Sequence, residues 1–313
     1  MLVIQSQNLD SAQSVHFARE LEIVRAKAYD VKYPELKGIS LVTLEQDPAG
    51  AETITYKQYD RAGVAKLIAN YADDIPVGDV FAKEFSARVF GFSNGYVYSI
   101  QDIRASQLAG SQLDLKRATN ARRVSDENHD RTIYFGNETA GMTGLFNNPN
   151  ITTGDVVAGA STTTAWTTKT PDEILKDLNN AFANVVTLTN GTEAPNTLLL
   201  PIAQLMYIQS TARSANSDLS ILEYFQRNRP EITRVDWINQ LADVGSRADM
   251  PDTTGSALMM YKADADVLGY RAPVWFEQFA PQEVNLAFKV ACHSRSAGVA
   301  FYRPLAAIIK GGI

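Results

Sequence analysis

The stretch that most constrains the fold is residues 96–150, and above all the polar helical run inside it. Residues 102–128 predict one helix of about 27 residues, about 40 Å long at the usual rise per residue. The apolar residues of this run are few and small, so they form a narrow stripe and not a wide core-facing side. We therefore expect a helix that lies across a surface and braces it. An exposed helix of an ordinary α+β domain and the spine of a thin assembly subunit both fit this pattern.

An interrupted pair of strands precedes the helix. Residues 53–59 alternate and are β-branched or aromatic, which predicts a strand, and residues 85–92 predict a second strand that leads into 96–100. Residues 60–86 connect them and break often at glycine and proline. A connection of about 25 residues is unusual inside a compact domain and is often functional. If it projects, its apolar side needs a partner chain; a loop folded back on its own domain fits the residues equally well.

The N-terminal third begins with an amphipathic helix predicted over residues 8–29, which Tyr33-Pro34 ends because the residue before proline is disfavoured in a helix. Residues 39–44 then predict a short strand.

The second half combines helices and strands. Thr170, Pro171 and Glu173 form a capping box at the start of a helix. A buried strand is predicted at Thr197–Leu200. Pro201 then opens a helix with Leu205, Met206 and Ile208 inward, and a further helix covers Asp218–Arg227. The remaining predicted strands are Glu231–Leu241, Ala257–Lys262, Val274–Phe279, Val284–His293, Gly298–Arg303 and Leu305–Ile309, with an exposed loop at 243–256. The class is α+β.

Composition narrows the functional classes. The chain has 313 residues, enough for one large or two medium domains, and its 45% hydrophobic and 20% charged content is ordinary for a folded protein. A net charge of −6 argues against a protein whose main task is to neutralise nucleic-acid phosphates, although it does not exclude a container around nucleic acid. No apolar run approaches a membrane span of about 18 residues, and the N-terminus lacks a signal-peptide core.

Residues that could carry catalysis are scarce. His16, His129 and His293 have no second histidine or cysteine at metal-ligand spacing, and His129 is predicted to be a solvated residue at a helix end. Cys292, the single cysteine, lies in an apolar strand and predicts a buried structural thiol. Nucleophile-elbow and phosphate-loop motifs are absent from the sequence. We therefore predict a non-enzyme with no catalytic, cofactor-binding or metal residues.

Several motifs, in this order, resemble a tailed-bacteriophage major capsid protein of the Hong Kong 97 type. They lie at residues 17–22, 52–56, 59–63, 72–76, 144–149 (Gly-Leu-Phe-Asn-Asn-Pro) and 302–311, and the match runs over nearly the whole chain. Each motif alone is weakly specific. Their order, with an interrupted hairpin before a long helix, is more specific.

The resemblance implies a Hong Kong 97-like capsid fold with the following parts. Residues 1–50 would form the N-terminal arm, 51–171 the first part of the peripheral domain, 172–285 the axial domain, and 286–313 the C-terminal part of the peripheral domain. Within the peripheral domain, 60–86 would be the extended E-loop that lies over a neighbouring subunit, and 102–128 the spine helix. Loop 243–256 would lie near the five- and six-fold axes.

The implied function is self-assembly, through pentamers and hexamers, into an icosahedral shell that encloses packaged double-stranded DNA. The implied partners are further copies of the chain, a portal protein, a separate scaffolding protein and DNA bound without sequence specificity, with a decoration protein as an optional addition and no membrane. The implied location is the virion, after assembly in the cytoplasm of the host bacterium. The candidate inter-subunit contacts are Asp60, Arg61, Lys66, Asp73, Asp74, Lys116, Arg117 and Arg122.

Three alternatives remain open at this stage. The same fold could form an encapsulin-like nanocompartment that holds a cargo enzyme. A secreted adhesin or carbohydrate-binding protein, and a hydrolase with dispersed acids, are less well supported. Some proteins of the resembled type crosslink a lysine of the E-loop to a neighbour's asparagine; Lys66 and Lys83 lie in the right region, but no motif identifies their partner.

Overall fold

The computed structural model describes residues 33–65, 77–109, 113–214, 216, 218–244 and 253–313. The chain divides into two units, Met1–Glu35 and Leu36–Ile313, and the account below concerns the second. The helix predicted at residues 8–29 lies outside the described residues, as does most of loop 243–256. Residues 36–50, predicted to belong to an arm, are part of the compact second unit.

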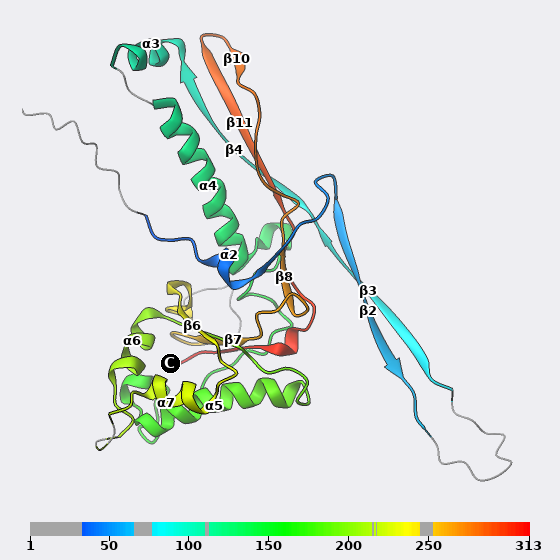
Figure 1. Ribbon diagram of the computed structural model, residues 1–313, viewed down its shortest axis with the longest axis vertical. Helices are drawn as coiled ribbons and strands as arrows, with labels where there is room; N and C mark the ends of the chain where they lie inside the picture. Colours follow the sequence, from blue (N-terminus) through cyan, green and yellow to red (C-terminus); the bar gives the residue numbers. More distant parts are fainter. Residues whose placement is uncertain (1–32, 66–76, 110–112, 215, 217, 245–252) are drawn as a thin grey trace, which may run out of the picture. The chain divides into compact units, whose positions relative to one another are not determined.

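One four-stranded sheet, called the central sheet below because apolar clusters cover both of its faces, lies in the lower part of Figure 1. Its strands are β5 (Thr197–Leu200), β6 (Arg234–Trp237), β7 (Leu258–Tyr261) and β13 (Ala307–Lys310), in the order β13-β7-β5-β6. Alternate residues of β5 point to opposite sides: Leu198 and Leu200 join one apolar cluster and Leu199 joins the other. Because both faces are buried, these strands are continuously apolar, which is why the strand at Thr197–Leu200 was correctly predicted.

Three helices share an apolar cluster with one face of this sheet. They are α5 (Pro171–Leu188), α6 (Ile202–Ser210) and α7 (Ile221–Asn228). The predicted capping box of α5 is present: Thr170 accepts from the Glu173 amide, and Glu173 accepts from the Thr170 amide. Leu205 and Ile208 are buried as predicted, but Met206 is 62% exposed, so that part of the prediction is wrong.

The cluster on the other face includes residues of two helices, α2 (Gly38–Leu41) and α4 (Leu113–Phe135). A strand was predicted at residues 39–44, but only Thr43 and Leu44 of this range belong to a strand, β1 (Thr43–Glu45). The predicted single helix over 102–128 is also corrected: the structure has α3 (Ile100–Ala109) and α4, which continues past Asn128 to Phe135. The continuation carries Ile133 and Tyr134 into the core, and this burial outweighs the strand preference of such residues.

A second sheet lies against α4. It contains β4 (Phe90–Ser99), β9 (Val274–Gln278), β10 (Gln282–Val284) and β11 (Ala287–Ser296), with β11 paired to each of the other three. The Asn94 side-chain amide donates to the Ala121 carbonyl of α4 over 2.6 Å. Cys292 is buried on β11 as predicted, and burial raises the pKa of its thiol.

His129 corrects another prediction. It lies within α4, fully buried, and its ring stacks on Trp275 at 4.2 Å. Its Nε2 lies 2.8 Å from the Trp275 carbonyl and its Nδ1 2.6 Å from the Tyr270 hydroxyl. Because a carbonyl only accepts, Nε2 carries the proton and Nδ1 accepts from the hydroxyl. The residue joins α4 to β9 and does not cap a helix end in solvent.

A third sheet has the order β1-β8-β12, where β8 is Leu268–Arg271 and β12 is Gly298–Phe301. Strand β8 was not predicted. Short 3-10 helices occupy Glu138–Ala140, Trp166–Thr168, Asn239–Leu241 and Pro304–Ala306. These pairings do not follow a boundary at residue 285, because β8, β9 and β10 pair with strands outside 172–285, whereas β13 pairs with β7 inside that range.

The last sheet is a two-stranded hairpin of β2 (Thr53–Ala62) and β3 (Asp79–Arg88), drawn in blue and cyan in Figure 1. In the described part of the chain neither strand pairs with a third. The strands extend well into the range 60–86 that was predicted as a broken excursion, with Ala62 opposite Asp79 and Thr53 opposite Arg88.

Candidate functional site

The root of the hairpin is fixed by aromatic packing. Tyr56 of β2 stacks on Phe85 of β3 with ring centroids 5.1 Å apart. The same ring meets Tyr302 edge-on at 4.8 Å. Such pairs contribute about 0.5–1.5 kcal/mol beyond their buried area. The root is therefore held against the segment that follows β12.

A buried charge cluster supports these rings. The Arg271 guanidinium lies 5.2 Å from the centre of the Tyr56 ring, and its Nη2 donates to the Tyr302 hydroxyl over 2.8 Å. That hydroxyl in turn donates to the Glu45 carboxylate over 2.7 Å. Burial and the bond to Glu45 raise the pKa of Tyr302 to about 12, so the hydroxyl keeps its proton at neutral pH. The cluster ties β1, β8 and the hairpin root together.

The outer part of the hairpin is apolar and exposed. Tyr59, Val64, Val77, Val80 and Phe81 all belong to the large apolar residues that the unit leaves in solvent. Two-stranded hairpins are marginally stable in water, and exposed apolar patches commonly mark protein–protein contacts. This part of the molecule is the strongest candidate for contact with another chain.

A groove of about 650 Å³ opens beside the hairpin root. Its wall combines hairpin residues, including Phe85 and Lys83, with the segment Phe301–Ala306. Leu305 on this wall is 46% exposed. The groove is thus an apolar depression whose floor is shared between the hairpin and the body of the same unit.

Charged residues border the groove. Glu193 accepts from Lys262 Nζ over 2.6 Å and from Arg303 Nη1. Burial raises the pKa of Glu193, but the hydrogen bonds from Lys262 and Arg303 outweigh it and hold the pKa below its usual range. Lys83 adds a further cation on the groove wall. The groove lining therefore carries two cations, Lys83 and Arg303, and one carboxylate, Glu193.

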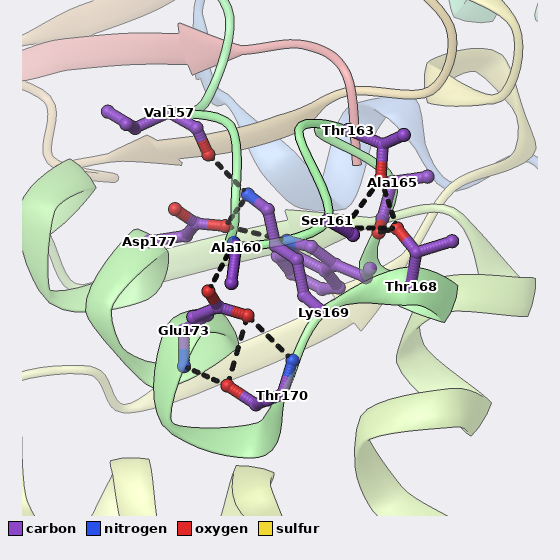
Figure 2. Close-up of polar contacts among 11 residues, drawn as sticks. Val157, Ala160, Ser161, Thr163, Ala165, Thr168, Lys169, Thr170, Glu173 and Asp177 are labelled. Atoms are coloured by element: carbon purple, nitrogen blue, oxygen red, sulfur yellow. Dashed lines mark hydrogen bonds and ion pairs between the residues drawn. The ribbon is translucent and has the colours of Figure 1, made fainter.

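A separate polar cluster holds the Thr/Gly-rich segment 151–168 on α5 (Figure 2). Lys169 Nζ lies 2.6 Å from Asp177 Oδ2 and also donates to the Val157 carbonyl over 2.7 Å. Trp166 Nε1 donates to the same carboxylate over 3.2 Å. Burial raises the pKa of Asp177, against the opposing effect of Lys169. Lys169 and Trp166 both bind Asp177 of the same unit, so we assign the cluster a structural role.

The candidate contact residues predicted from the sequence are dispersed. Asp60 and Arg61 lie exposed on β2, whereas Lys66, Asp73 and Asp74 lie outside the described residues. Lys116 and Arg122 are exposed on α4, and the Arg122 guanidinium sits 5.9 Å from the Phe276 ring. Their role as contacts stays a prediction.

Arg117 is already engaged inside its own chain. It donates to the Val97 carbonyl over 2.9 Å and pairs with Asp102 at 3.2 Å, joining α4 to β4 and α3. The hydrogen bonds of Ser99 and Arg117 lower the pKa of Asp102. Arg117 therefore braces elements of its own chain, and its role as an inter-subunit contact stays a prediction.

Sequence reasoning missed the anchor of the hairpin. Glu45, Arg271 and Tyr302 are far apart in the chain, and no spacing pattern connects them. Lys83 was noted only as a lysine of the hairpin. The alternation of residues 53–59 was the one local signal that could have led to Tyr56.

The described residues contain no group of three or more histidine, cysteine, aspartate or glutamate side chains that could hold a metal ion. No helix within the described ranges combines the length and apolar character needed to cross a bilayer.

Comparison with solved structures identifies the fold. The capsid of Myoviridae phage XM1 superposes with a TM-score of 0.80 at 15% identity, covering 95% of this chain and 98% of that one. A structure of Mycobacterium phage Adephagia matches with a TM-score of 0.62 at 12% identity, covering 95% and 96%. The virus-like particle from Pyrococcus furiosus matches at 0.50 and 12%, covering 87% and 91%. The fold is the Hong Kong 97-like capsid fold, as predicted.

The sequence gives the family directly. A search of curated proteins found no match. The family model described as "Major capsid protein" matches residues 63–313, which include the long helix, the central sheet and the groove segment. The resemblance predicted from the motifs is confirmed, and the adhesin and hydrolase alternatives gain no support. The chain belongs to the major capsid protein family.

Proposed function

We propose that copies of this chain assemble through pentamers and hexamers into a closed icosahedral shell that encloses packaged double-stranded DNA. The observation that carries the proposal is the hairpin β2–β3, which exposes apolar side chains and, in the described residues, pairs with no third strand. A neighbouring subunit would cover it. Family membership and the capsid fold support this reading.

The proposed parts of the subunit follow the strand pairing. The hairpin is the E-loop, α3 and α4 together form the spine, and the central sheet with α5, α6 and α7 forms the axial part. We place β8, β9 and β10 with the peripheral part and β13 with the axial part, because that is how these strands pair. Residues 1–35 are proposed to form the arm.

The proposed partners and location extend the same reading. A net charge of −6 suits a container that lets DNA pack without binding it tightly or by sequence. A portal protein and a separate scaffolding protein would complete the particle, with a decoration protein as an optional addition. The chain would act as a non-enzymatic structural protein, assembled in the cytoplasm of the host bacterium and retained in the virion.

Assembly can be observed directly. We expect the chain, expressed alone or with its neighbouring genes, to form closed shells visible by negative-stain electron microscopy. A chain that stays monomeric under all these conditions contradicts the proposal.

A second candidate is a nanocompartment that holds a cargo protein, favoured by the likeness to the Pyrococcus furiosus virus-like particle. Its TM-score of 0.50 is well below the 0.80 of the phage XM1 capsid. Nuclease-protected DNA inside particles from the native source would support the virion. Particles that contain a protein cargo and no DNA would support the nanocompartment.

The role of the hairpin is tested by shortening it. Gln58 lies opposite Lys83, so residues 59–82 can be replaced by Asn-Gly, a two-residue turn that suits a hairpin. The root Tyr56–Phe85 pair stays intact. We expect a folded subunit that forms no closed shells. Loss of folding would show that the hairpin belongs to the core of the subunit.

A further inference from the structure

We propose that the outer part of one hairpin seats in the groove at the root of the next subunit's hairpin. We call the inserting residues the knob: Asp60, Asp79 and Phe81. We call the receiving residues the socket: Lys83, Phe85, Phe301, Pro304, Leu305 and Arg303. The inference rests on the proposed function, because it requires a second copy of the chain, and it names where and how the two copies touch.

The knob lies on one face of the hairpin. Asp60 is directly opposite Phe81, and Ala62 is opposite Asp79. Residues opposite each other in an antiparallel pair share a face, and every second residue returns to it. Phe81 is 59% exposed. Within the described residues, the carboxylates of Asp60 and Asp79 each accept a hydrogen bond from the adjacent backbone amide at 2.8 Å. This face therefore presents an aromatic ring flanked by two acids.

The socket has the complementary character. Phe85 and Leu305 give it an apolar wall, and the volume of about 650 Å³ is open to solvent. Lys83 and Arg303 outnumber Glu193 among the charged residues of its lining, so its border is positive. An aromatic ring would replace water against the apolar wall, while the two acids meet the cations. Such complementarity favours correct docking over other contacts.

A chain cannot satisfy itself in this way. Phe81 and Phe85 lie on the same face of β3, four residues apart, which is about 13 Å along a strand. The knob therefore extends beyond the socket of its own hairpin, so we assign that socket to the knob of another copy. Knob and socket are different surfaces of one chain, so the contact is head-to-tail, and repeating it around an axis closes a ring.

The first test compares two adjacent residues. Val80 is 56% exposed, close to the value for Phe81, but lies on the opposite face of β3. We expect Phe81→Ser to raise the subunit concentration needed for assembly by at least about tenfold, as loss of a buried aromatic anchor does. Val80→Ser should change it by less than about twofold. Light scattering against concentration measures both.

The second test reverses charge. Asp60→Lys should weaken assembly, because it places a cation against the positive socket border. Adding Lys83→Asp should restore most of the assembly lost in Asp60→Lys if Asp60 of one copy faces Lys83 of the next. An uncharged control, Asp60→Asn, should fall between wild type and Asp60→Lys. A double variant no better than Asp60→Lys contradicts the pairing.

The third test traps the contact. Chains carrying Phe81→Cys and chains carrying Leu305→Cys are mixed, assembled and oxidised, so any bond between the two positions joins different copies. Native Cys292 is buried and should contribute little background. We expect a crosslinked dimer from Phe81→Cys and much less from Val80→Cys in the same mixture.

The outcomes separate the two proposals. If wild-type chains assemble but Phe81→Ser assembles equally well and the trap gives no dimer, the knob-and-socket contact is wrong while the shell stands. If wild-type chains never assemble, the proposed function fails, and this contact fails with it.

Discussion

The central sheet β13-β7-β5-β6 and the hairpin β2–β3 are both built of strands, yet they obtain stability from different sources. The sheet is short-stranded and has apolar clusters on both faces, all inside one chain. The hairpin has strands of 10 residues, and its outer part is in solvent. The first region completes its packing in the monomer, whereas the second has apolar surface left over for a partner.

The difference shows that an assembly subunit uses separate residues for folding and for binding its neighbours. A body that folds alone keeps each copy intact before assembly, and a projecting element with unsatisfied apolar surface makes association favourable. The anchor of Arg271, Tyr302 and Glu45 joins the hairpin root to the sheet β1-β8-β12, so that contacts made by the hairpin are transmitted to the body. Variants of the central sheet should accordingly change the free energy of unfolding of the monomer, and variants of the outer hairpin should change assembly.

The largest loss of monomer stability is expected from Lys169→Met. Lys169 and Asp177 have side chains only 0% and 5% exposed, and the variant leaves the Asp177 carboxylate buried without its cation. We expect the free energy of unfolding, measured by urea denaturation of unassembled subunits, to fall by about 3–5 kcal/mol. The double variant Lys169→Met/Asp177→Leu should lose clearly less. A loss below about 1 kcal/mol in the single variant would contradict the structural role of the pair.

A core substitution should separate the two regions most clearly. Leu199→Ala opens a cavity in the central sheet and should cost about 2–5 kcal/mol of monomer stability. Phe81→Ala on the hairpin should cost less than about 0.5 kcal/mol, as exposed substitutions do, but should impair assembly. Equal effects on unfolding would show that the hairpin is as much a part of the folded core as the sheet.

The body should also carry a pH dependence that the hairpin lacks. Burial lowers the pKa of His129 from 6.5, against the opposing effects of the Trp275 hydrogen bond and Asp126. The unfolded chain therefore binds this proton first as pH falls, so the stability contributed by neutral His129 is complete above about pH 6.5 and declines below it.

Unfolding of the subunit at pH 7.5 and at pH 5.5 measures this effect. His129→Gln should flatten the pH dependence relative to wild type. Replacing residues 59–82 by Asn-Gly should leave it unchanged, because the hairpin sequence contains no histidine. A wild-type subunit as stable at the lower pH as at the higher one would contradict the assignment.

The sequence predicted the elements whose structure depends on residues close together in the chain. The capping box at Thr170 and Glu173 sets the start of α5 from four consecutive residues, and the apolar run of β5 predicts a doubly covered strand. The order of motifs was enough to identify the family. These features could be predicted because their physical causes lie within a few residues of each other.

Other features depend on packing between distant segments. His129 is polar and lies in a polar helix, so its burial follows only from the position of Trp275 on β9. Strand β8 contains Gly269 and Arg271, which favour neither alternation nor an apolar run, and it is defined by β1 and β12 on either side. The socket similarly combines a hairpin wall with the segment after β12. No local pattern contains that information.

The smallest effect is expected at the exposed pair of Lys57 and Glu84. These residues face each other across the hairpin at 2.9 Å, with side chains 56% and 60% exposed. Solvent and salt screen such a pair, so Lys57→Met should change the free energy of unfolding by less than about 1 kcal/mol. The pair lies on the face opposite the knob, and assembly should therefore be retained. If Lys57→Met instead abolished assembly while Phe81→Ser did not, the hairpin would contact its neighbour through the opposite face. The knob-and-socket assignment would then be wrong.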